Sequence, residues 1–157
     1  MLKTSASLTV LLLAASLAGT PALAASDHAY DGHGAADLVL SLDDGQKWET
    51  DAPLRAAMET IRDALAAVAD DVHDDTMTSA EYGALAAAVE SQVDYMVVNC
   101  ELPPDADAQL HVLLEQVLEG AEQLRGEEPE AAVTMVAEAL DAYGTHFSHA
   151  DWEPLTH

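Results

Sequence analysis

Four segments of this chain, between residues 50 and 149, repeat hydrophobic residues at intervals of three and four. The repeated positions are Leu54, Met58, Ile61, Leu65, Val68 and Val72; Tyr82, Leu85, Val89, Val93, Met96 and Cys100; Leu110, Leu113, Leu114, Val117, Ala121 and Leu124; and Val133, Val136, Leu140, Tyr143 and Phe147. This spacing places the side chains on one face of an α-helix, and no segment shows the alternating pattern of a β-strand. Short connections favour antiparallel neighbours. The sequence therefore predicts an all-α protein, an antiparallel up-down four-helix bundle over residues 51–157.

Residues that start and stop helices stand at the boundaries of these segments. Thr50 or Asp51 can cap the first helix, and Thr78 with Glu81 has the spacing of a capping box at the start of the second. The pair Pro103-Pro104 ends the second segment and begins the third. These signals support the helix boundaries that the hydrophobic spacing predicts.

The N-terminus has the features of a secretory signal peptide. Lys3 is followed by an apolar run from Leu8 to Ala18 and then by small residues ending at Ala24. The run is too short to cross a bilayer, and no later segment resembles a membrane span. We therefore expect a signal peptide over residues 1–24, an irregular N-terminal arm over residues 25–50, and a mature protein that is soluble in the periplasm.

The chain contains 29 Asp and Glu residues against 5 Lys and Arg, which gives a formal net charge of -24. This charge argues against nucleic acid as a partner, because its phosphates would be repelled. The same charge keeps a surface solvated and can attract cations or a basic partner. Cys100 is the only cysteine, so no disulfide can form within the chain and stability must come from packing or a bound ligand.

Six side chains suited to a soft metal fall at one end of the predicted bundle. Because alternate helices run in opposite directions, the starts of the first and third helices lie beside the ends of the second and fourth. The six are Met58, Met96, Cys100, His111, His146 and His149. Thiolate, thioether and imidazole groups suit copper, particularly Cu(I). We therefore predict a copper-binding protein for storage, delivery or sensing, although a lone cysteine or methionine also fits a core role.

The copper prediction depends on the direction in which these side chains face. Met58, Met96 and Cys100 lie on the apolar stripes, which directs them inward. His111 and His146 lie at stripe edges, from which they could turn inward at the bundle end. His146 and the third residue after it, His149, share a face only if the fourth helix extends that far.

Two alternatives to copper remain open. Met58 and His146 or His149 resemble the ligand layout of cytochrome b562, so the same end could hold non-covalent haem b; the chain has no Cys-x-x-Cys-His motif for covalent haem. The other alternative is a bundle without a ligand that binds a protein partner. The sequence contains no nucleophile elbow, His-Glu-x-x-His or phosphate loop, so it does not indicate an enzyme.

The N-terminal arm contains two further histidines, His28 and His33. A histidine that is third from a free amino terminus can complete a Cu(II) site, and cleavage after Ala25 would place His28 there. A polar arm without a metal is the simpler interpretation.

Four more residues are interpreted as structural. His73 and Met77 lie in the turn at the opposite end of the bundle, where a solvated turn explains them. Trp48 and Trp152 flank the helical region, and we expect them to cover the end where the candidate ligands gather.

Two segments, Leu42–Arg55 and Asn99–His111, resemble those of an uncharacterised group of exported proteobacterial proteins, and the likeness extends through the mature domain. The resemblance implies a location in the cell envelope. It assigns no activity and no site residue.

Overall fold

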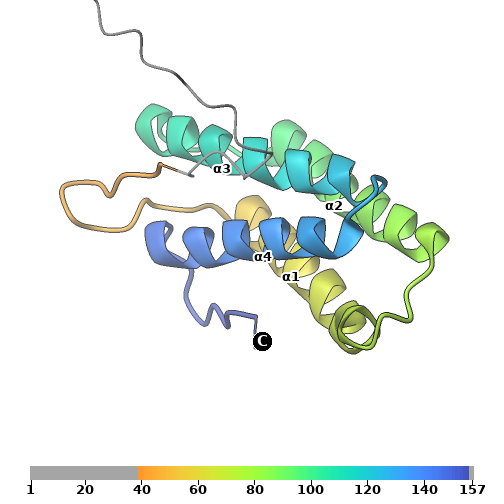
Figure 1. The fold of residues 1–157 in the computed structure, drawn as a ribbon. Coiled ribbons are helices and arrows are strands. Elements are labelled where there is room, and N and C mark those ends of the chain that lie inside the picture. The colour runs from red at the N-terminus through yellow and green to blue at the C-terminus, as the bar shows by residue number, and fades with distance from the viewer. Residues whose placement is uncertain (1–38, 156–157) are drawn as a thin grey trace, which may run out of the picture. The chain divides into compact units, whose positions relative to one another are not determined.

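The computed structural model describes residues 39–155, and the predicted signal peptide, His28 and His33 lie outside this range. Its helices are α1 (Ala52–His73), α2 (Ser79–Asn99), α3 (Pro104–Gln123) and α4 (Pro129–His146) (Figure 1). Across residues 39–155 the only β-type pairing is two isolated bridges, Asp43 with Gln46 and Trp48 with Phe147. The predicted all-α four-helix bundle is confirmed.

The helix starts follow the capping signals in the sequence. Asp51 caps α1, and its Oδ1 accepts a hydrogen bond of 2.9 Å from the Leu54 N–H. Thr78 and Glu81 form the predicted capping box at the start of α2, where each side chain accepts from the backbone N–H of the other. Such caps satisfy N–H groups that have no partner within the helix, and each typically contributes about 1 kcal/mol to stability.

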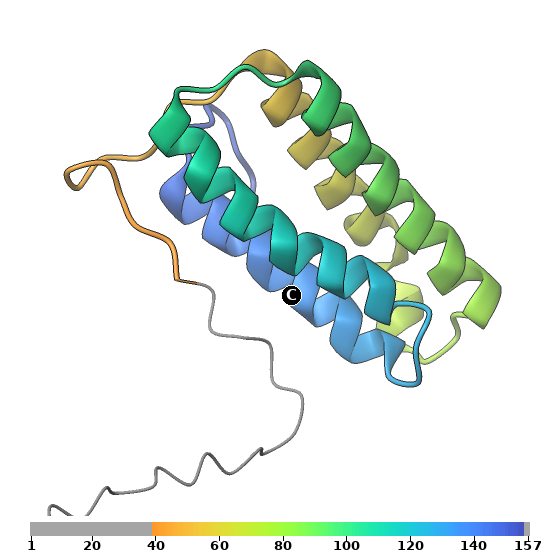
Figure 2. The same cartoon turned by 90° about the horizontal axis from the view of Figure 1, so that it is seen from above.

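The helices pack in chain order around one hydrophobic core. The connections α1–α2 and α3–α4 lie at one end and the α2–α3 connection lies at the other (Figure 2). The close approach of α3 and α4 depends on Gly120, since a Cβ there would lie 2.6 Å from Cγ2 of Val136. Helix α1 packs extensively against α2 and less extensively against α4. The α1–α4 side of the bundle is therefore its most open side.

Two non-helical segments pair at the end where α4 finishes. The Trp48 N–H donates to the His146 carbonyl, and the Ser148 N–H donates to the Trp48 carbonyl, both at 2.8 Å. Residues 147–155 then return along the bundle (Figure 1). Within residues 39–155, none of the helices combines the length and apolar character needed to cross a membrane.

Candidate functional site

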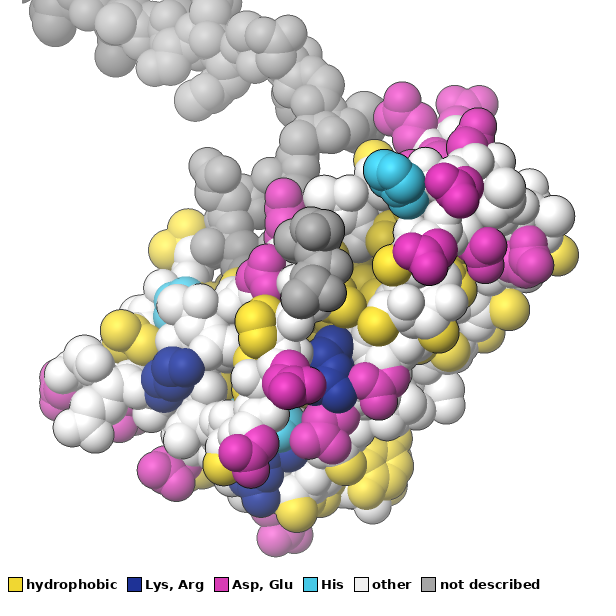
Figure 3. Space-filling model, turned by 90° about the horizontal axis from the view of Figure 1, so that it is seen from below, with side chains coloured by type: hydrophobic (Ala, Val, Ile, Leu, Met, Phe, Trp, Pro, Cys, Tyr) yellow, Lys and Arg dark blue, Asp and Glu magenta, His cyan; other side chains and the backbone are white. Residues whose placement is uncertain are grey.

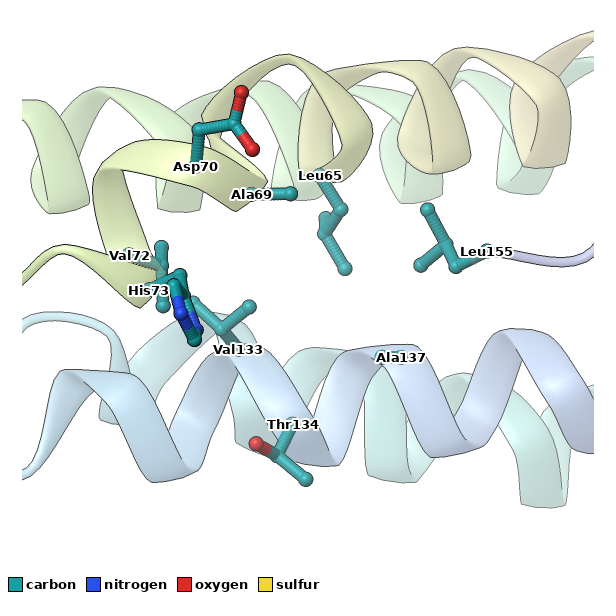
Figure 4. Close-up of a pocket in the computed structure, with 9 residues that line it drawn as sticks. All are labelled: Leu65, Ala69, Asp70, Val72, His73, Val133, Thr134, Ala137 and Leu155. Carbon is teal, nitrogen blue, oxygen red and sulfur yellow. The ribbon is translucent and has the colours of Figure 1, made fainter. Parts of the chain in front are cut away.

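A groove of about 490 Å³ runs between α1 and α4 (Figure 4). Its apolar walls come from both helices and from the C-terminal segment. They include Leu65, Ala69 and Val72 of α1, Val133 and Ala137 of α4, and Leu155. Ligand pockets of this kind, between the helices of a bundle, commonly have volumes of about 300–1,000 Å³.

The groove exists because small side chains stand where α1 and α4 face each other. Ala69 and Ala137 fill little of the space between the two helices, and these helices make fewer contacts than the other neighbouring pairs. Leu65 and Val133 point into this space, and Leu155 enters it from the C-terminal segment (Figure 4). The apolar surface that closer packing would have covered is thus available to a ligand.

Polar groups are confined to the part of the groove near the end of α1. Asp70, His73 and Thr134 line it there. The His73 ring lies between the helices, whereas the Asp70 carboxylate stands at the rim and points away from α4 (Figure 4). On the face seen in Figure 3, hydrophobic side chains lie exposed between groups of acidic ones.

The C-terminal segment is held against the bundle by His149. The His149 side chain is only 2% exposed and uses both ring nitrogens: Nδ1 lies 3.0 Å from the Tyr143 hydroxyl and Nε2 lies 3.0 Å from Oε1 of Glu59. A carboxylate can only accept, so Nε2 carries the proton and donates to Glu59. Burial raises the pKa of Tyr143, which keeps its hydroxyl protonated and able to donate to Nδ1.

Trp152 adds a second anchor for the same segment. Its ring packs edge-on against Tyr143 at 4.9 Å between centroids, and the Arg62 guanidinium lies 5.4 Å from its centroid. Gly144 allows this position, since a Cβ there would lie 2.6 Å from the indole nitrogen. The Trp152 and His149 ring centroids lie 5.2 Å apart, so Trp152 covers His149 at the end of the bundle where the sequence places it. Trp48 packs against the hydrophobic core.

The three candidate sulfur ligands lie in or beside the core. Met58 and Met96 are buried, and Cys100 is half-buried at the C-cap of α2. Burial, together with the carboxylates of Asp51 and Asp107, raises the pKa of the Cys100 thiol to about 12. The thiol is thus protonated at neutral pH, which makes it a poor nucleophile and means that a metal would have to displace its proton.

The candidate histidines face different surroundings. The His111 side chain is 69% exposed, and its Nδ1 lies 2.9 Å from the Asp107 carbonyl, so this ring has not turned inward. The His146 Nδ1 lies 2.8 Å from the Ala142 carbonyl. Helix α4 ends at His146, so His149 lies beyond the helix and the condition for a helical face shared by the two histidines is not met.

Asp107 interacts with both Cys100 and His111. The Asp107 carboxylate lies 3.5 Å from Nδ1 of His111 and also acts on the Cys100 thiol. Among residues 39–155, no three His, Cys, Asp or Glu side chains are grouped so that they could hold a metal ion. A copper site that includes Met58 or Met96 stays a prediction.

The haem alternative also stays a prediction. The Met58 side chain is fully covered by its neighbours in the core. A haem ligated by Met58 and His146 would therefore have to displace packed side chains at this end.

The groove between α1 and α4, near the end of α1, was not predicted from the sequence. His73 and Met77 are predicted from the sequence to be solvated turn residues. His73 is exposed as predicted but also lines the groove, whereas Met77 is half-buried against the core. The signal available in the sequence was the cluster of alanines and valines near the end of α1 and the start of α4. Such a cluster equally describes close-packed helices, so it could not identify a groove.

Comparisons with protein-family models, curated proteins and solved structures found no match for this chain. The resemblances to exported proteobacterial proteins and to cytochrome b562 remain predictions from the sequence.

Replacing Gly144 tests the anchoring of the C-terminal segment. Gly144→Ala should push the Trp152 ring away from α4, because the new Cβ would lie 2.6 Å from its nitrogen. We expect a loss of about 1–3 kcal/mol in the free energy of unfolding. In a Trp48→Phe background, Trp152 fluorescence should shift to the red and become easier to quench with acrylamide.

Gly83→Ala is the matched control, since a Cβ at Gly83 would meet no atom within 4 Å. It should leave Trp152 fluorescence unchanged and stabilise α2 by up to about 1 kcal/mol. If Gly144→Ala left the accessibility of Trp152 unchanged, the proposed anchoring would be wrong.

Proposed function

We propose that this protein binds a small, mainly apolar molecule in the groove between α1 and α4. The observation that carries this proposal is the groove itself, about 490 Å³ in volume and lined by hydrophobic side chains from three separate segments. An apolar molecule placed there would remove these side chains from water, and each Å² of apolar surface covered contributes about 25 cal/mol. The protein would act as a carrier or receptor.

The reactive side chains favour binding over catalysis. Both nitrogens of His149 already have partners, so the ring has no nitrogen left for a substrate. The raised pKa of Cys100 keeps its thiol in the unreactive form. The occupied nitrogens of His149 and the protonated thiol of Cys100 support a binding protein that is not an enzyme.

The site of action that we propose is the periplasm. The support comes from the signal-peptide pattern of residues 1–24, with Lys3 before the apolar run. The intact mass of exported protein tests this: it should correspond to cleavage near Ala24, and a mass that retains Lys3 would contradict export.

An uncharged fluorescent probe, Nile red, tests the groove directly. Its emission should rise and shift to the blue when the protein is added, because the probe leaves water for an apolar site. Ala69→Phe should lower this binding at least about tenfold, since the larger ring would occupy the groove. Binding is measured by titration at constant probe concentration.

Ala67→Phe is the control for this variant. Ala67 is also exposed on α1 but does not line the groove. Its replacement should leave Nile red affinity within about twofold of the unmodified protein. Equal loss in both variants, or none in either, would place the probe outside the groove and contradict the proposal.

Copper binding is the second candidate function. The observation in its favour is that Cys100 packs against the hydrophobic cluster that contains Met58 and Met96. Three sulfur ligands would suit Cu(I). The site that we propose uses these residues, with His111, His146 or His149 joining only after rearrangement of the hydrogen bonds that they make at present.

Cys100→Ser separates a copper site from a core cysteine. It should lower Cu(I) affinity at least about tenfold, measured by competition with a chromophoric chelator, and leave the helical circular-dichroism spectrum intact. Met135→Leu, which changes a methionine outside the candidate set, should have no effect. Unchanged affinity in Cys100→Ser would exclude copper here, and a Soret band after incubation with haem would instead favour the Met58 and His146 alternative.

A further inference from the structure

We infer that the ligand of the groove is a cationic amphiphile, with its apolar part between α1 and α4 and a positively charged amine or ammonium group at the rim beside Asp70. This inference rests on the function proposed above and specifies the chemical class of the ligand. The apolar walls define one part of the molecule and the charges around the groove define the other.

The apolar part follows from the groove walls. Leu65, Val133 and Leu155 present alkyl groups to the space between the helices. Polar lining groups are restricted to the end near His73. A ligand that fills the groove must therefore be apolar along most of its length and can carry a polar group at that end only.

An anionic head group would find no Lys or Arg partner in the groove. Residues 39–155 contain four of the five Lys and Arg residues, and none of the four lines the groove. Each already donates to another group of the protein. Lys47 and Arg55 donate to the carbonyls of Gly144 and Thr50, and Arg62 and Arg125 pair with the carboxylates of Asp63 and Glu90.

A cationic head group would be attracted at the same place. Asp70 lines the groove, and Asp71, Asp74 and Asp75 follow it within the next five positions. Across residues 39–155, the Asp70 carboxylate makes no ion pair with a Lys or Arg. Its charge is available to a ligand, and the neighbouring aspartates add to the negative potential at the rim.

His73 is the one lining residue that can itself become positively charged, and it shares this end with Asp70. Ligand affinities are therefore compared at about pH 8, above the pH range in which histidines ordinarily change charge.

Competition against Nile red with a matched set of ligands tests the inference. Decyltrimethylammonium, decyl sulfate and 1-decanol share one alkyl chain and differ in the charge of the head group; all are used below micelle-forming concentrations. We expect the ammonium compound to bind at least about tenfold more tightly than the sulfate, with the alcohol between them. The preference should shrink as salt is added.

Two variants separate the rim from the general negative charge of the protein. Asp70→Asn should weaken the ammonium compound about three- to fivefold and leave 1-decanol unchanged. It should fold normally, because a carboxylate in the last turn of a helix opposes the helix dipole. Asp94→Asn removes the same charge from an exposed position on α2 and should change neither affinity.

The outcomes distinguish the inference from the proposed function. Equal or tighter binding of the sulfate, or equal effects of the two Asp variants, would overturn the cationic class while leaving the groove as an apolar site. No competition by any of the three compounds, with Nile red still bound, would also overturn it. Failure of Nile red to bind at all would remove the proposed function, and the inference would fall with it.

Discussion

Helix α1 packs its apolar face against two neighbouring helices, α2 and α4, and the two interfaces differ in extent. Helix α1 packs extensively on α2 and less on α4, whereas α3 and α4 approach closely because Gly120 lets Val136 come near its backbone. A bundle can close completely only if side chains fill every helix interface. Between α1 and α4, Ala69 and Ala137 are too small to do so. The groove, its apolar walls and the function proposed for it all depend on this incomplete interface.

The C-terminal segment is part of that interface, because it covers space that the helices leave open. Its position depends on His149, held between Tyr143 and Glu59, and on Trp152, which fits against α4 only because residue 144 is glycine. Leu155 reaches the groove as a consequence. Polar contacts at the end of α4 thus position a hydrophobic side chain farther along the groove.

Most of the fold could be predicted from the sequence because helices are specified by local patterns. The capping box at Thr78 and Glu81 occupies the predicted positions. The candidate metal site was harder to predict, because it depends on where each side chain points and on which groups each side chain bonds to. His111 lies at the surface, where its ring contacts a carbonyl of its own helix. Helix α4 ends at His146, before the position at which His149 could share its face. The groove depends on how closely two helices approach, which hydrophobic spacing does not report.

The most direct measurement is the set of intermolecular nuclear Overhauser effects between bound decyltrimethylammonium and methyl-labelled protein. If the ligand lies between α1 and α4, its alkyl protons should contact the methyl groups of Leu65, Val133 and Leu155. Val97 and Val98 on α2, which are 74% and 80% exposed, provide methyl groups that any adhering hydrophobic chain could reach. Contacts to the groove methyls and none to Val97 and Val98 are the predicted result. Contacts to the α2 valines without contacts to the groove would contradict the account.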